Sequence, residues 1–173
     1  MLPTNVAVVH FPDVRSATAA SIEVINRGAG KYSYVFFSCN FLKDINNIFF
    51  LIPECVELLD PLSLKAINAY GMSTRKWPEQ ASLFFKFQGP SDASLKETAS
   101  TVRQIVETYG GSGFALARNE KEAHEIWMDR KNLFHSKLAL MKGSRGVTTD
   151  VWYVILKPPQ LVRECEAENR CYV

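Results

Sequence analysis

Apolar residues recur along the chain with two different periods, which predict an alternation of strands and helices. Four short runs rich in β-branched and aromatic residues predict strands, at residues 6–11, 54–59, 82–88 and 114–117. Apolar residues spaced by three and four positions predict helices, at residues 14–27, 61–70, 95–109 and 119–142. An extended stretch at 147–156 is expected to follow the last helix.

This order of elements predicts an α+β fold of the ferredoxin-like kind. In that arrangement helices pack on one face of a mainly antiparallel sheet to form a sandwich. A parallel α/β sheet is the alternative, because strands and helices alternate throughout. A chain of 173 residues fits one domain with a sizeable core.

Several helix ends are marked by particular residues. Asp60 is expected to cap the second helix, and Ser94 with Glu97 is expected to form a capping box for the third. The glycines of residues 110–113 follow a helix and precede a strand, which is the reverse of a dinucleotide-binding loop. We therefore interpret them as a turn.

The predicted helix at 119–142 carries the main candidate for ligand binding. Asn119 and Glu122 resemble a capping box, and Lys142-Gly143 is the expected stop. Its apolar stripe consists of Ala123, Ile126, Trp127, Phe134, Leu138 and Met141. Arg130 lies within this stripe, and Lys137 lies on the same face two turns further on.

Two cations on a core-facing side require an explanation, because an unpaired buried charge is costly. One interpretation is that their methylenes cover apolar surface while their charged ends reach water. The other is that an anion is bound there. Since a planar guanidinium can bind both oxygens of a carboxylate, Arg130 is the stronger candidate, ahead of Lys137.

The composition is typical of a globular protein, with 47% hydrophobic residues, 22% charged residues and a net charge of +2. Basic residues are scattered singly, so no nucleic-acid partner is expected. The cysteines lack the spacing of zinc sites or disulfide frameworks and are expected to be reduced thiols of an intracellular protein. His10 ends a predicted strand and is interpreted as structural.

Residues 31–53 differ from the rest of the chain. The segment KYSYVFFSCNFLKDINNIFFLIP is apolar and shows neither helical nor strand periodicity. It could form a buried hairpin or helix, contact a membrane, or lie outside the fold altogether. No run reaches the roughly 18 to 20 apolar residues needed to span a bilayer. The N-terminus lacks the features of a signal or transit peptide.

Several blocks of the sequence resemble a known family. ECVELLD (54–60), SLFFKFQG (82–89), NEKEAHEIWMDRKN (119–132) and TTDV (148–151) occur in the order found in the C-terminal substrate domain of FAD-linked oxidases. Mitochondrial, cytochrome-linked D-lactate dehydrogenases are the most similar branch. The resemblance extends over residues 1–162, is interrupted at 31–52, and leaves 163–173 as a divergent tail.

The resemblance implies a function and a set of residues. The Arg of the family's W-x-x-R block binds the carboxylate of a 2-hydroxy acid, which assigns this role to Arg130 next to Trp127. Thr149 and Asp150 of the TTDV block are the other expected substrate-binding residues. The family oxidises D-lactate to pyruvate by hydride transfer to FAD, with cytochrome c as acceptor, in mitochondria. The resemblance assigns no catalytic, cofactor-binding or metal-binding residue to this chain.

The sequence also departs from the family in four places. The family's FAD-binding domain precedes this region, and its H-x-G-D-G-N-x-H block, which binds a divalent metal, follows the TDV strand. Neither is found in these 173 residues. Residues 31–52 interrupt the match, as a translated intervening sequence would. Val154 and Leu156 stand where the family has Pro and Ser.

These departures predict that the chain alone is inactive. Two other hypotheses stay open: a non-catalytic interaction or ligand-binding module, in which residues 31–53 contact a partner, and a remnant without function.

Overall fold

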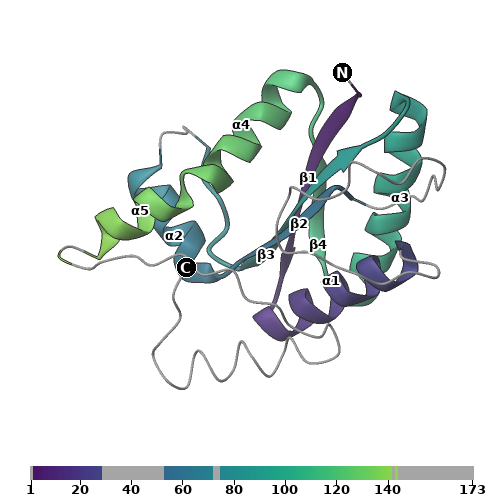
Figure 1. Cartoon of the computed structure of the whole chain (residues 1–173). Coiled ribbons are helices and arrows are strands. Elements are labelled where there is room, and N and C mark those ends of the chain that lie inside the picture. Colours follow the sequence, from purple (N-terminus) through teal and green to yellow (C-terminus); the bar gives the residue numbers. More distant parts are fainter. Residues whose placement is uncertain (1, 29–52, 72–74, 142, 144–173) are drawn as a thin grey trace.

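The computed structural model describes residues 2–28, 53–71, 75–141 and 143 (Figure 1). Within these residues the chain forms four strands and five helices. Their order is β1 (Thr4–Phe11), α1 (Val14–Gly28), β2 (Cys55–Leu59), α2 (Pro61–Tyr70), β3 (Ala81–Gln88), α3 (Asp92–Thr108), β4 (Ser112–Leu116), α4 (Glu120–Lys131) and α5 (Leu133–Leu140).

The strands form one sheet in the order β2-β3-β1-β4, and every neighbouring pair is antiparallel. The central pair, β1 and β3, is in register along its full length, from Thr4 opposite Gln88 to Phe11 opposite Ala81. The predicted α+β class and antiparallel sheet are confirmed, and the parallel alternative is wrong. The β-α-β-β-α-β order of a ferredoxin-like unit is present, with α2 added between β2 and β3.

The two faces of the sheet belong to two apolar clusters, because successive side chains of a strand point to opposite sides. On one face Val9, Phe85 and Phe87 pack with residues of α1 and α3. These two helices are the predicted helical layer (Figure 1). The other face carries further helices that the sequence did not place there. Its cluster contains Val6, Val8, Phe84, Leu64 and Ile67 of α2, and Ile126 of α4.

The caps of α2 and α3 were predicted with unequal success. Asp60 caps α2 as expected, and its side chain accepts a hydrogen bond from the backbone N–H of Ser63 at 2.6 Å. The capping box of α3 is formed by Ser91 and Ser94, so the predicted pair of Ser94 and Glu97 is wrong. Ser91 is extended and accepts from the N–H of Ser94, which places the start of the helix three residues earlier.

The predicted single helix at 119–142 is wrong, because the chain forms α4 and α5 with a break at Asn132. Asn119 caps α4 as expected and accepts from the N–H of Glu122 at 2.9 Å. The apolar stripe is buried in α4 at Ala123 and Ile126, but it ends at Met141, which is 55% exposed. Beyond the break, α5 packs mainly against α2. The apolar residues of α4 and α5 therefore do not face the same part of the core.

Several predictions fall on residues outside the described parts. These are the segment 31–52, the extended stretch 147–156 and the tail 163–173. Among the helices that are described, none combines the length and the hydrophobicity that crossing a membrane requires.

Candidate functional site

Arg130 lies near the end of α4 and contacts a carboxylate of the same chain. Its Nη2 atom is 2.6 Å from Oε1 of Glu57 on β2. Its guanidinium also lies 5.9 Å from the centre of the Trp127 ring. The side chain is 34% exposed, so it is neither fully buried nor extended into water. The carboxylate that contacts Arg130 in the structure is therefore that of Glu57, a residue of the chain itself.

Helical spacing explains why Arg130 lies beside Trp127. Residues three positions apart are neighbours on a helix surface, and α4 packs across the sheet face that contains Val6, Val8 and Phe84. Glu57 is opposite Phe84 in the pairing of β2 with β3. The contact between Arg130 and Glu57 therefore joins the end of α4 to the edge strand of the sheet.

A second ion pair lies close to the same indole. Lys86 Nζ is 2.9 Å from Glu54 Oε2 and 5.9 Å from the centre of the Trp127 ring. We call Glu54, Glu57, Lys86 and Arg130 with Trp127 the Trp127 cluster. Its two basic and two acidic side chains form two ion pairs, so their formal charges sum to zero.

The sequence analysis missed Glu54, Glu57 and Lys86 as members of a site. Glu57 lies in β2, in which all residues but the last are half-buried. Strand periodicity therefore gave no reason to select it. The Sγ of Cys55, two residues before it and therefore on the same face, donates to Glu57 Oε1 at 3.3 Å. Pairing with Arg130 depends on how α4 crosses the sheet, which local sequence does not reveal.

Lys137, the second cation of the predicted stripe, is also paired. Its Nζ lies 3.7 Å from Oδ1 of Asp60, the residue that caps α2. This contact joins α5 to α2 and gives Lys137 a structural explanation that needs no bound anion.

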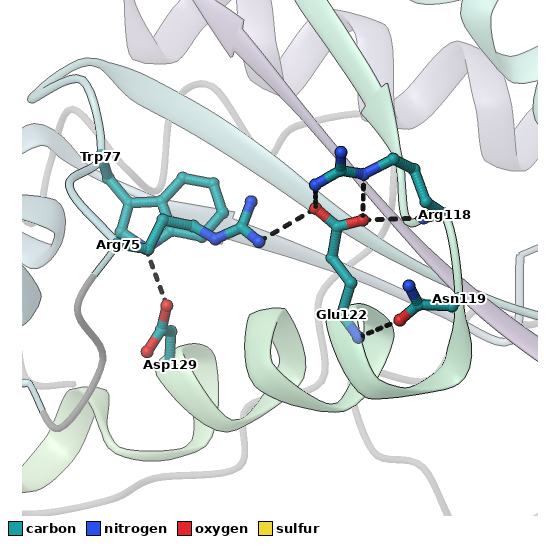
Figure 2. Close-up of polar contacts among 6 residues, drawn as sticks. All are labelled: Arg75, Trp77, Arg118, Asn119, Glu122 and Asp129. Carbon is teal, nitrogen blue, oxygen red and sulfur yellow. Dashed lines mark hydrogen bonds and ion pairs between the residues drawn. The ribbon is translucent and has the colours of Figure 1, made fainter.

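A separate group of polar side chains lies along α4, between Asn119 and Asp129 (Figure 2). The carboxylate of Glu122 accepts from Arg75 Nη2 at 3.0 Å, from Arg118 Nε at 3.0 Å, and from the backbone N–H of Arg118 at 2.8 Å. These contacts lower the pKa of Glu122 to about 2. The side-chain hydrogen bond from Arg118 is the largest cause, followed by its backbone N–H and by Arg75.

Asp129, immediately before Arg130, is the buried charge that the sequence analysis missed. Its side chain is 2% exposed, and Oδ2 accepts a hydrogen bond from the indole N–H of Trp77 at 3.0 Å (Figure 2). Helical periodicity had indicated Arg130 as the charge facing the core. The structure instead buries Asp129 and leaves Arg130 at the margin, because Trp77 supplies a donor from 52 residues away.

His10 has a structural environment, as the sequence suggested. Its Nδ1 lies 2.7 Å from the hydroxyl of Ser82, which in turn donates to the carbonyl of Gln80 at 3.0 Å. Burial lowers the pKa of His10, so the neutral ring is favoured.

Comparison with known proteins decides the family. A family model described as FAD linked oxidases, C-terminal domain, matches residues 40–171. The chain belongs to this family. The matched range includes Arg130 and Trp127. It also includes Thr149 and Asp150, and these two residues lie outside the described parts of the chain.

Curated relatives of this FAD-linked oxidase domain are named as D-lactate dehydrogenases. A probable mitochondrial D-lactate dehydrogenase of Danio rerio is 26% identical over 94% of this chain and 28% of its own length. The mitochondrial D-lactate dehydrogenase (cytochrome) of Kluyveromyces lactis is 30% identical over 73% of the chain and 18% of its length. The mitochondrial D-lactate dehydrogenase (cytochrome) 1 of Saccharomyces cerevisiae is 30% identical over 66% of the chain and 20% of its own length. The chain thus spans less than a third of these relatives.

A solved structure supports the fold of the domain. The structure of alkyldihydroxyacetonephosphate synthase matches 96% of the chain and 30% of its own length, with a TM-score of 0.55. At 14% sequence identity this likeness concerns the fold alone.

The family description implies FAD. Among the described residues, the glycine-rich turn after α3 does not form a binding site for the phosphates of FAD. Gly110 and Gly113 have positive φ angles and follow the C-terminal end of α3. A helix end of that kind presents carbonyl oxygens, whereas phosphate binds at N-terminal ends, where N–H groups are exposed. For metals, no three His, Cys, Asp or Glu side chains gather into a binding group within the described parts of the chain.

Proposed function

We propose that this chain is the substrate domain of a flavin-dependent dehydrogenase acting on D-lactate or a related D-2-hydroxy acid. In this proposal Arg130 binds the substrate carboxylate. The observation that carries it is the Arg130–Glu57 contact of 2.6 Å beside Trp127, which places a carboxylate against this guanidinium. The names of the relatives support the choice of substrate.

The contact with Glu57 leaves N–H donors of the Arg130 guanidinium unused. The contact with Glu57 uses a single nitrogen, Nη2, whereas a guanidinium has five N–H donors arranged in a plane. About a third of the side chain is exposed, so a small carboxylate can approach the remaining donors or displace Glu57. Trp127 covers one side of the guanidinium and limits how it can turn.

The rest of the reaction depends on parts beyond the described residues. FAD would supply the hydride acceptor, and in this proposal Arg130 holds the substrate carboxylate so that the carbon to be oxidised is correctly oriented. We propose that Thr149 and Asp150 add contacts to the substrate. Cytochrome c is the proposed electron acceptor and mitochondria the proposed location, following the names of the yeast relatives. The proposal also includes a divalent metal near the substrate in the complete enzyme, as the family resemblance implies.

Binding of small carboxylates tests the role of Arg130. D-Lactate and oxalate are titrated at low salt into the ¹⁵N-labelled chain. The indole N–H resonance of Trp127, which lies beside residue 130, is followed in every variant, and the Nε–H resonance of Arg130 is followed wherever that residue is present. We expect saturable shifts in the wild type, weaker binding in Arg130→Lys, and none in Arg130→Met, because Lys lacks the planar fork. Arg103→Met is the matched control, since Arg103 forms an exposed pair with Glu107 on α3. Equal binding by the wild type and Arg130→Met would refute the assignment.

Replacing Glu57 tests whether it occupies the position of the substrate carboxylate. In Glu57→Gln the Trp127 cluster gains one net positive charge, and an incoming anion no longer meets Glu57 as a competitor. We expect oxalate to bind several-fold more tightly than to the wild type, and the gain to shrink as salt is added. Weaker binding by Glu57→Gln would show that Glu57 supports the ligand instead of competing with it.

A spectroscopic measurement tests the expectation that the chain alone is inactive. Because the glycine turn offers no phosphate cradle, we expect the purified chain to show no flavin absorbance and no D-lactate-dependent dye reduction. Stoichiometric bound flavin would contradict the expectation that the chain alone is inactive. The role of Arg130 would still be decided by the carboxylate titration.

A further inference from the structure

We propose that Trp77 and Asp129, assisted by the Arg75–Glu122 ion pair, are positioning residues that fix the rotation of α4 and so direct Arg130 toward β2 (Figure 2). This inference rests on the proposed carboxylate-binding role of Arg130. It assigns a function to residues other than Arg130 itself.

Glu122 and Asp129 project from the same side of α4. Glu122 and Asp129 are seven residues apart, which is about two helical turns, so both side chains leave the same side of the helix. Their partners Arg75 and Trp77 are two residues apart in the segment that leads to β3. The segment therefore binds α4 at two points, one near its N-terminus and one near its C-terminus.

The distances along the two chains are compatible with this arrangement. Seven residues of helix rise about 10 Å, whereas two residues of extended chain cover about 7 Å. The long side chain of Arg75 can make up the difference in reaching Glu122, whereas the indole of Trp77 meets Asp129 directly. Two contacts separated along the axis restrict both sliding and rotation of the helix.

Trp77 is itself firmly held, so it can serve as a reference point for α4. Its ring packs against Phe84 of β3 with centroids 5.3 Å apart. Its backbone N–H donates to Asn68 Oδ1 at 2.8 Å, and its carbonyl accepts from Asn68 Nδ2 at 2.8 Å. Asn68 belongs to α2, so the position of Trp77 is set jointly by α2 and the sheet.

The burial of Asp129 makes this contact sensitive to rotation. A carboxylate that is 2% exposed depends on its hydrogen bonds, and turning α4 would remove the indole donor without giving access to water. Arg130 is the next residue, about 100° further round the helix. With Asp129 held toward Trp77, Arg130 faces Glu57 on β2.

The test follows Arg130 and Trp77 in the ¹⁵N-labelled full chain. Asp129→Leu and Trp77→Phe remove the acceptor and the donor, and Asp129→Asn keeps an oxygen acceptor. Glu125→Leu, at an exposed position of α4, is the matched control. We expect the first two variants to shift the Arg130 Nε–H resonance and to weaken oxalate binding about tenfold, with Asp129→Asn restoring most of the affinity and Glu125→Leu unchanged.

Each outcome bears on the inference. Folded Asp129→Leu or Trp77→Phe variants with a wild-type Arg130 resonance and wild-type oxalate affinity would overturn it, since the contact would then serve stability alone. If Asp129→Leu fails to fold, Trp77→Phe and Asp129→Asn decide the matter. If the wild type binds no carboxylate, the proposed function fails, but the Arg130 resonance still reports whether the contact orients the side chain.

Discussion

At the scale of single residues, three charged side chains of α4 and α5 have partners that are remote in sequence. Arg130 meets Glu57, Lys137 meets Asp60, and Asp129 accepts from Trp77. Helical periodicity indicated Arg130 and Lys137 as the charged residues on the core face, whereas the most buried acidic residue there is Asp129. Periodicity could not show which charge is buried, because the deciding donor comes from a different segment of the chain.

The low pKa of Glu122 predicts a pH dependence of stability. In the folded chain the pKa is about 2, against 4.5 for the unperturbed group. A depressed carboxyl pKa contributes stability that is present above pH 4.5 and is lost as the pH falls toward 2. We expect Glu122→Gln to lower the free energy of unfolding at pH 7 by about 1–2 kcal/mol, allowing for screening of the exposed Arg118. Urea unfolding at several pH values measures this.

The control for Glu122 is Glu107→Gln. Glu107 pairs with Arg103 at 2.8 Å, but both side chains are at least half exposed, so the change should have little effect at any pH. The difference between wild type and Glu122→Gln should narrow as the pH falls below 4.5. A difference that stays constant to pH 2.5 would contradict the link to ionisation of Glu122.

At the scale of elements, the sequence predicted the described strands and helices well because their determinants are local. Asp60, Asn119 and the glycines at 110–113 mark ends that the structure retains. The break at Asn132 was missed because the residues on either side are all compatible with a helix. It coincides with a change of packing partner from the sheet to α2, and such tertiary contacts cannot be read from local sequence.

Asp60 has two roles that substitutions can separate. It caps α2 through the N–H of Ser63, and it lies 3.7 Å from Lys137 of α5. We expect Asp60→Ala to lower the free energy of unfolding by about 1 kcal/mol through loss of the cap. Asp60→Asn keeps a capping oxygen and should cost only a few tenths, because the ion pair with Lys137 is long and Asp60 is 41% exposed. Thermal unfolding of both variants measures the difference.

Asp92→Ala provides the comparison for Asp60. Asp92 is an exposed residue in the first turn of α3 and follows the capping residue Ser91, so its loss removes only a favourable charge near the helix N-terminus. Equal effects of Asp60→Ala and Asp60→Asn would show that the charge contact with Lys137, and not the cap, supports α2.

At the scale of the whole molecule, the strand order and the site were the parts that sequence alone could not supply. β1 pairs with β3 across at least seventy residues, and β2 reaches the edge of the sheet only because β3 lies between it and β1. The Trp127 cluster unites residues of β3 and α4 with Glu57 of β2 and with Glu54, the residue before that strand. The W-x-x-R block indicated Arg130, but its partner depended on this topology.

The alternation of β3 predicts that neighbouring phenylalanines act on different halves of the molecule. Phe84 packs with Trp77 and the α4 side, whereas Phe85 packs with α1 and α3 and stacks on Phe87. Both are fully buried, so Phe84→Leu and Phe85→Leu should each lower the free energy of unfolding by about 1–3 kcal/mol in urea. Only Phe84→Leu should shift the Trp77 indole and Arg130 resonances, because it alone alters the packing that holds Trp77. Equal shifts in Phe85→Leu would mean that the two apolar clusters respond as one unit.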